Sequence, residues 1–140
     1  MTRECVTLDN GLQIWLEPKP DRYTASFGIW IGAGSCMEQP ENNGVSHFLE
    51  HMFFKGSRNC TGAQLAERMD AIGGQSDAYT TKEHTCFYAR TLTEHVEEGL
   101  ALLLDMVANP AMRETDFQTE RGVILEEIGM AIDDAEDAVA

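Results

Sequence analysis

Apolar and polar residues alternate along the start of the chain, a pattern typical of half-buried β-strands. Residues 4–8 and 12–16 both alternate, and Asn10-Gly11 between them has the residue types of a tight hairpin turn. We therefore predict a β-hairpin. Residues 24–31 predict a third strand, which ends before the glycine-containing segment 32–35. Three apolar residues of this strand share one face: Phe27, Ile29 and Ile31.

The pattern then changes from strand to helix. Residues 38–43 are polar and contain a proline, which predicts a loop, and residues 44–54 predict a helix. Thr61 and Gln64 form a capping-box pattern that begins a second helix, and Gly73-Gly74 ends it. The apolar residues of this second helix recur at helical spacing: Leu65, Met69 and Ile72.

Two strands and two helices are predicted in the rest of the chain. Residues 75–81 and 83–91 suit neighbouring strands, and a helix over 96–107 ends at Asn109-Pro110. We assign the apolar stripe of that helix to the core: Val96, Leu100, Leu103, Leu104 and Val107. A capping-box pattern over residues 115–118 begins a last helix that runs past Met130. The fold class is α+β, with helices packed on a mostly antiparallel sheet.

Composition narrows the range of functions. A length of 140 residues with 43% hydrophobic content suits one globular domain, and a net charge of −14 argues against nucleic acid or an anionic membrane as partner. We find neither a signal peptide nor a run of roughly 20 apolar residues that could span a membrane, so we expect a cytoplasmic location. The cysteines form no Cys-x-x-Cys pair and predict free thiols: Cys5, Cys36, Cys60 and Cys86.

Candidate chemistry is concentrated in the segment His47-Phe48-Leu49-Glu50-His51. The two histidines are four residues apart, so they lie one turn apart on one helical face and can bind one Zn²⁺ together. A catalytic zinc site takes three protein ligands and leaves one position open for water. Glu50, beside the metal, is placed to act as the base that takes a proton from this water.

The last predicted helix offers a third ligand. Glu120 and Glu127 are seven residues apart and share a face with apolar residues, whereas Glu126 is rotated away from it. The apolar residues of this face are Ile124, Ile128 and Ala131. A carboxylate on an apolar face is costly without a partner such as a cation. We assign Glu127 as the third ligand of one Zn²⁺ per chain, and Glu120 as the residue that orients a ligating histidine.

Other polar groups have simpler interpretations. His84 and His95 have no partner at ligand spacing, and we expect surface or strand-packing roles for them. The acidic segment 133–137 lacks the glycine turn and distal glutamate of a calcium-binding loop, so we interpret it as a solvated helix end.

Residues 44–57, which contain the histidine motif, resemble the signature of the M16, or pitrilysin, peptidases, the family of insulin-degrading enzyme and the mitochondrial processing peptidase. The resemblance covers nearly the whole chain. It places the family's distal glutamate ligand on Glu127 and its upstream acidic helper on Glu120. Further matching positions lie outside the motif: Gly34-Ser35, Glu38, Gly73-Gly74, residues 77–80 and residues 120–128.

The resemblance implies a LuxS/MPP-like metallohydrolase fold, with residues 1–140 as the N-terminal zinc-binding part of an M16-type peptidase domain. M16 peptidases consist of two homologous halves, and we interpret this chain as a truncated first half. The implied partners are a peptide substrate and a second M16 half or homologous subunit, and uncovered surfaces also favour a homo-oligomer. Where the family commonly has asparagine, this chain has Asp77. We expect the substrate to add a strand beside Asp77, Ala78, Tyr79 and Thr80.

We therefore predict a zinc-dependent metalloendopeptidase that hydrolyses peptide bonds in peptides or unfolded segments and has little activity as this isolated chain. The alternative is an M16-like scaffold subunit that is catalytically silent or depends on a partner. Such subunits usually lose the histidine motif, which is present here. A purely structural zinc site fits poorly, because its fourth ligand would be a cysteine or histidine at suitable spacing.

Overall fold

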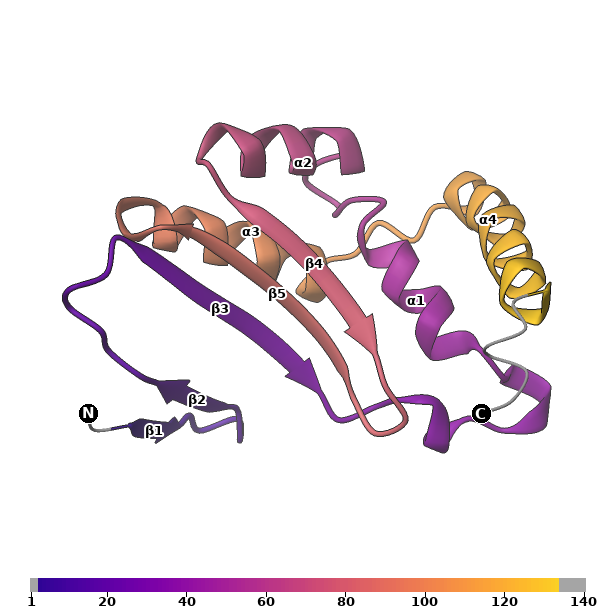
Figure 1. Ribbon diagram of the computed structural model, residues 1–140, viewed down its shortest axis with the longest axis horizontal. Helices are drawn as coiled ribbons and strands as arrows, with labels where there is room; N and C mark the ends of the chain where they lie inside the picture. The colour runs from indigo at the N-terminus through magenta and orange to yellow at the C-terminus, as the bar shows by residue number, and fades with distance from the viewer. Residues whose placement is uncertain (1–2, 134–140) are drawn as a thin grey trace.

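The computed structural model describes residues 3–133, and the side chains of residues 3–130. Its centre is an antiparallel sheet with the strand order β3-β5-β4, formed by β3 (Thr24–Ile31), β5 (Thr85–Leu92) and β4 (Gln75–Thr80) (Figure 1). The predicted pairing of the last two strands is confirmed, with Gln75 opposite Arg90. Helices and antiparallel strands together confirm the α+β class.

The predicted hairpin forms a separate two-stranded sheet, with β1 (Glu4–Thr7) antiparallel to β2 (Gln13–Leu16). Gly11 adopts a positive φ of 88° in the turn, a conformation that glycine tolerates best. At the turn, β1 ends one residue earlier and β2 begins one residue later than the apolar pattern predicts, because Leu8 and Leu12 already belong to the loop. There the amide of Leu8 donates to the carbonyl oxygen of Leu12 at 2.9 Å.

Two helices pack on one face of the three-stranded sheet and enclose the core: α2 (Gly62–Ala71) and α3 (Val96–Ala108) (Figure 1). The capping box of α2 is confirmed, because Thr61 and Gln64 each accept a hydrogen bond from the other's backbone amide. Alternation in β5 turns its odd-numbered residues toward these helices. The buried core combines both helices and the sheet: Leu65, Met69, Ile72, Phe87, Ala89, Leu102, Leu103 and Met106.

The predicted core stripe of α3 is partly wrong. Leu103 is buried, but Leu100 and Leu104 are 37% and 45% exposed. The buried face runs instead through Gly99, Leu102, Leu103 and Met106. A Cβ atom at Gly99 would lie 2.7 Å from Cγ2 of Thr91, so the missing side chain lets α3 approach the sheet at this point. This close approach sets the rotation of the helix.

Helix α1 (Val45–Phe53) follows a loop that contains two short 3₁₀ helices, Ser35–Met37 and Pro40–Asn42. The Glu38 carboxylate in this loop accepts hydrogen bonds from the amides of Gly44, at 2.6 Å, and Ser46, at 2.8 Å. These hydrogen bonds lower the pKa of Glu38 and satisfy amides at the start of α1 that have no partner within the helix. The start of α1 is therefore fixed relative to the end of β3.

Helix α4 (Glu114–Asp133) lies beside α1, away from the sheet (Figure 1). It begins at Glu114, one residue before the predicted cap, so Thr115 lies within the first turn and the Thr115 capping box is wrong. Gln118 instead donates to the side chain of Glu114 at 2.7 Å. A third 3₁₀ turn, Thr93–His95, precedes α3. Among the described residues, no helix has the length and apolar character needed to cross a membrane.

Candidate metal centre

Helix α1 places two imidazoles side by side. The ring centroids of His47 and His51 are 4.7 Å apart in an edge-on arrangement, and their Nε2 atoms are 3.2 Å apart. Oε2 of Glu127, from α4, lies 3.7 Å from each of these nitrogens. The three side chains are half-buried, so the space between them is accessible to a small ligand.

These three donor atoms suit a zinc ion. In a tetrahedral site with metal–ligand distances of about 2.0–2.2 Å, neighbouring ligand atoms are about 3.3–3.6 Å apart. The observed separations of 3.2 and 3.7 Å bracket this spacing. Two imidazole nitrogens and one carboxylate oxygen are ligands that zinc accepts, and three of them leave a position for water. Among the described side chains, residues 3–130, no other group of histidine, cysteine or acidic residues brings three possible ligand atoms this close together.

Packing between α1 and α4 brings the three residues together. The rings of Phe48 and Phe117 are in contact, with centroids 4.7 Å apart. Ile124 is buried on the same face of α4, and Glu126 is exposed. Glu120 and Glu127 thus face α1, as the helical-face argument predicts. The prediction is wrong for Ile128, which is 49% exposed. The side chain of Ala131 lies outside the described residues.

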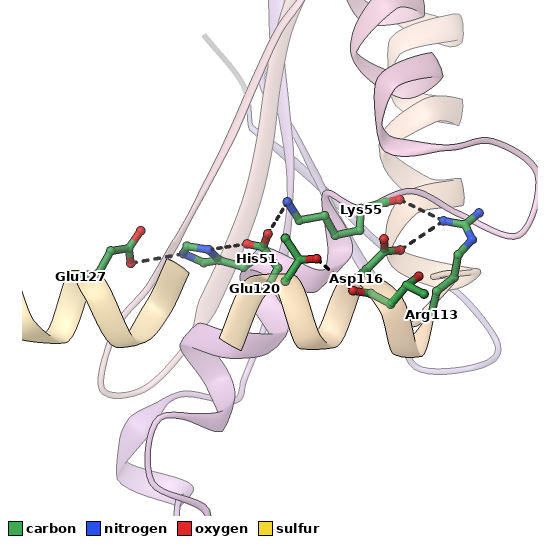
Figure 2. Close-up of polar contacts among 8 residues, drawn as sticks. His51, Lys55, Arg113, Asp116, Glu120 and Glu127 are labelled. Carbon is green, nitrogen blue, oxygen red and sulfur yellow. Dashed lines mark hydrogen bonds and ion pairs between the residues drawn. The ribbon is translucent and has the colours of Figure 1, made fainter. Parts of the chain in front are cut away.

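Glu120 lies behind the histidines and is only 3% exposed. Its Oε2 lies 3.2 Å from Nδ1 of His51, and its Oε1 lies 2.5 Å from Nζ of Lys55, as Figure 2 shows. Burial raises the pKa of Glu120, but the hydrogen bonds from Lys55 and His51 and the positive charge of Lys55 outweigh this effect and lower the pKa. Because a carboxylate only accepts hydrogen bonds, Nδ1 of His51 carries the proton, and Nε2 of the neutral ring is free to bind metal.

Lys55 is a site residue to which the sequence analysis assigned no role. Its position four residues after His51 places it one turn further along the chain, within reach of the same carboxylate. The guanidinium of Arg113 also donates to the carbonyl oxygen of Lys55 at 3.2 Å and lies 3.4 Å from the Asp116 carboxylate (Figure 2). These contacts fasten the start of α4 to the segment that follows α1.

The side chain of Glu50 is held by the sheet. Thr80, the last residue of β4, donates its hydroxyl hydrogen to Oε2 of Glu50. Nearby, the hydroxyl oxygens of Thr80 and Thr85 are 3.4 Å apart. The expected base therefore lies between the histidines of its own helix and the end of β4.

The four predicted substrate-binding residues divide between two faces of β4. Asp77 and Tyr79 are exposed, whereas Ala78 packs against the hydrophobic core and Thr80 contacts Glu50. The Asp77 carboxylate accepts a hydrogen bond from Tyr88 at 3.3 Å, and its charge raises the pKa of Tyr88. Among the described strands β4 pairs with β5 alone, so its other edge is unpaired.

The remaining candidates lie away from this centre. Thr81 binds His84 in the β4–β5 turn, with their Oγ1 and Nδ1 atoms 3.1 Å apart, and His95 lies 3.8 Å from Glu94. The acidic segment lies beyond the described residues from position 134 onward. All four cysteines are free, as predicted.

An HxxEH helix whose histidines meet a glutamate from a later helix, beside an antiparallel sheet, is the arrangement expected of an inverted-motif metallopeptidase. Comparison with known proteins identifies the family. Residues 13–140 match Insulinase (Peptidase family M16), and the chain belongs to this family. This finding confirms the resemblance seen in the sequence.

Relatives with similar sequences carry peptidase names. The chain is 46% identical to "Uncharacterized zinc protease YmxG" from Bacillus subtilis over 133 residues, which are 95% of this chain and 32% of that protein. It is 43% identical to the "Probable mitochondrial-processing peptidase subunit beta, mitochondrial" from Arabidopsis thaliana, over 87% of this chain and 23% of that protein. The chain thus spans a third or less of the length of these curated relatives.

A solved structure supports the fold. The chain is similar to a protease from Helicobacter pylori with a TM-score of 0.85 and 28% sequence identity. The similarity covers 90% of this chain and 30% of the other. The described elements therefore form the first part of an M16 peptidase fold.

Proposed function

We propose that this chain supplies the zinc ligands and the catalytic base of a metalloendopeptidase, with His47, His51 and Glu127 as ligands and Glu50 as base. The observation that carries the proposal is the convergence of two imidazoles and a carboxylate at 3.2–3.7 Å. The same helix presents Glu50 beside the two histidines. The zinc protease name of the Bacillus subtilis relative supports the choice of metal.

The residues divide the chemistry among them. A zinc ion held here would lower the pKa of a coordinated water and polarise the carbonyl group of the scissile peptide bond. Glu50 accepts a proton from the attacking water at the carboxylate oxygen that Thr80 does not occupy, and delivers it to the leaving amine. Glu120 keeps the hydrogen on Nδ1 of His51, so that Nε2 faces the metal.

We propose that the peptide substrate binds as an added strand along the unpaired edge of β4, beside residues 77–80. Edge strands bind extended peptides through backbone hydrogen bonds, which tolerate many side chains. Peptides and unfolded segments are therefore the substrate class that fits. Asp77 and Tyr79 contribute exposed side chains, whereas Ala78 and Thr80 contribute backbone groups.

We further propose that a second M16 half, or a homologous subunit, closes the site. The described site is open to solvent, and efficient hydrolysis requires an oriented carbonyl group and exclusion of bulk water. Relatives about three to four times as long as the matched region, one of them named as a subunit, support a partner. A subunit that lacks activity without its partner is the second candidate function.

The test uses an internally quenched peptide with the chain alone, with zinc, and with a complementary M16 half in trans. We expect chelator-sensitive cleavage on mixing, and none from Glu50→Gln, because an amide cannot accept the proton. Equal cleavage by wild type and Glu50→Gln would refute the assignment of the base. Robust cleavage by a demonstrated monomer would refute the need for a partner.

A further inference from the structure

Glu50 is anchored from outside its own helix. The hydroxyl of Thr80 donates to Oε2 of Glu50 across the contact between α1 and β4. Alternation in β4 turns its even-numbered residues toward the helices, and the strand ends at Thr80. This contact therefore depends on where β4 ends, which the motif in α1 does not determine.

The available hydrogens fix the direction of this bond. A threonine hydroxyl has one hydrogen to donate, and an ionised carboxylate can only accept. Thr85, buried beside Thr80, donates its own hydrogen to the carbonyl oxygen of Ala33 at 2.9 Å. This hydrogen is not available to Thr80, whose oxygen is 3.4 Å away. The hydrogen of Thr80 is therefore committed to Glu50.

This contact has a consequence for proton transfer. With Oε2 accepting the hydrogen bond from Thr80, Oε1 of Glu50 has no hydrogen-bond partner among the described residues and is the oxygen left to accept a proton. Exposed glutamate side chains rotate freely, and fixing the carboxylate removes that freedom before the reaction. Thr85 in turn lies against Thr80 and is hydrogen-bonded to the loop after β3. The position of Thr80 is therefore itself fixed.

We propose that Thr80 is a positioning residue for the catalytic base, holding the Glu50 carboxylate with one oxygen free for the attacking water. This inference rests on the proposed function. It also links the positions of the two substrates of the reaction, the peptide and the attacking water. A peptide added along β4 would take its register from the strand whose last residue orients the base, so the peptide and the attacking water are positioned by one element.

The test compares Thr80→Val, which removes the hydroxyl at constant shape, with Thr80→Ser, which keeps it. Thr91→Val is the matched control, since the buried Thr91 hydroxyl has no hydrogen-bond partner among the described residues. In the enzyme assembled with its complementary half, kcat of Thr80→Val should fall about 10–100-fold, the size of effect that misplacing a reacting group produces. KM and zinc content should stay near wild type. Thr80→Ser should restore most of kcat, and Thr91→Val should leave it unchanged.

Crystal structures of the zinc-loaded wild-type, Thr80→Val and Thr80→Ser chains give a readout that needs no activity. The Glu50 carboxylate should leave its position in Thr80→Val and keep it in Thr80→Ser. A wild-type kcat in Thr80→Val, an unmoved Glu50, or loss of zinc in parallel with kcat would overturn the proposal. Equal hydrolysis by wild type and Glu50→Gln would instead refute the proposed function, while the crystal structures still decide whether Thr80 positions Glu50.

Discussion

Glu120 on α4 accepts a hydrogen bond from Nδ1 of His51 on α1, with 3.2 Å between the two atoms. This single contact joins two helices that are far apart in the sequence. It also selects the tautomer of His51 that exposes Nε2 toward His47 and Glu127. The carboxylate is buried, and Lys55 balances its charge from the other side.

Replacing Glu120 should weaken metal binding without removing a ligand. Glu120→Gln keeps the shape of the side chain but loses the charge that holds His51, and such partners of metal-binding histidines are typically worth about 10–100-fold in affinity. Competition with a zinc-binding dye measures the change. Glu126→Gln is the matched control, because Glu126 lies exposed on another face of the same helix. An unchanged affinity in Glu120→Gln would contradict the role given to this contact.

Lys55→Met should destabilise the fold. It leaves the buried Glu120 carboxylate with one positive partner fewer, which we expect to cost about 1–3 kcal/mol because Lys55 itself is partly exposed. Chemical denaturation measures the change in the free energy of unfolding. Lys19→Met is the control: Lys19 lies 3.2 Å from Glu17 in an exposed pair, which should contribute less than about 1 kcal/mol. Equal effects of the two substitutions would refute the structural role of Lys55.

Glu38 should make stability depend on pH in the acidic range. Two backbone amides lower the folded-state pKa of Glu38, so its contribution is complete above the unfolded pKa of about 4.3 and is lost as pH falls through the folded value. The stability difference between wild type and Glu38→Gln should therefore be constant near neutral pH and shrink below about pH 4.3. Thermal unfolding across this range tests it, with exposed Glu41→Gln as control. A difference that grows on acidification would contradict this sign.

Gly99→Ala tests the close packing of α3. Its new methyl group would lie 2.7 Å from Cγ2 of Thr91 and 2.9 Å from the Phe27 ring, and such overpacking costs about 1–3 kcal/mol. Gly122→Ala on α4 meets no atom within 4 Å and should instead gain up to about 1 kcal/mol from helix propensity. Urea denaturation of both variants provides the comparison. Stabilisation by Gly99→Ala would show that α3 does not need this glycine.

Most of the fold, and the grouping of the proposed metal ligands, could be predicted from local sequence patterns. Strand alternation located residues 24–31 correctly, and helical periodicity placed Glu120 and Glu127 on the face of α4 that meets α1. Both patterns depend only on residues close together in the chain, so they can be recognised in a single sequence. Family resemblance added the fold type, which similarity to solved and curated proteins confirms.

Contacts between distant segments could not be predicted in this way. Periodicity includes the exposed Leu100 and Leu104 in the predicted core stripe of α3, because it shows which residues share a face but not which face meets the sheet. The face that meets the sheet is the one that contains Gly99, where the missing side chain lets α3 approach Thr91 closely. The contact of Thr80 with Glu50 likewise depends on where β4 ends beside α1, and 30 residues separate the two in the chain.

Zinc binding by three proteins tests the central claim most directly: wild type, Glu127→Gln and Glu126→Gln, each titrated with zinc by calorimetry at neutral pH. Adjacent glutamates on one helix make this a strict comparison, because only Oε2 of Glu127 lies 3.7 Å from both imidazoles. The account predicts one zinc per wild-type chain, the same in Glu126→Gln, and affinity lowered by more than about 100-fold in Glu127→Gln. Wild-type affinity in Glu127→Gln together with loss of binding in Glu126→Gln would contradict it.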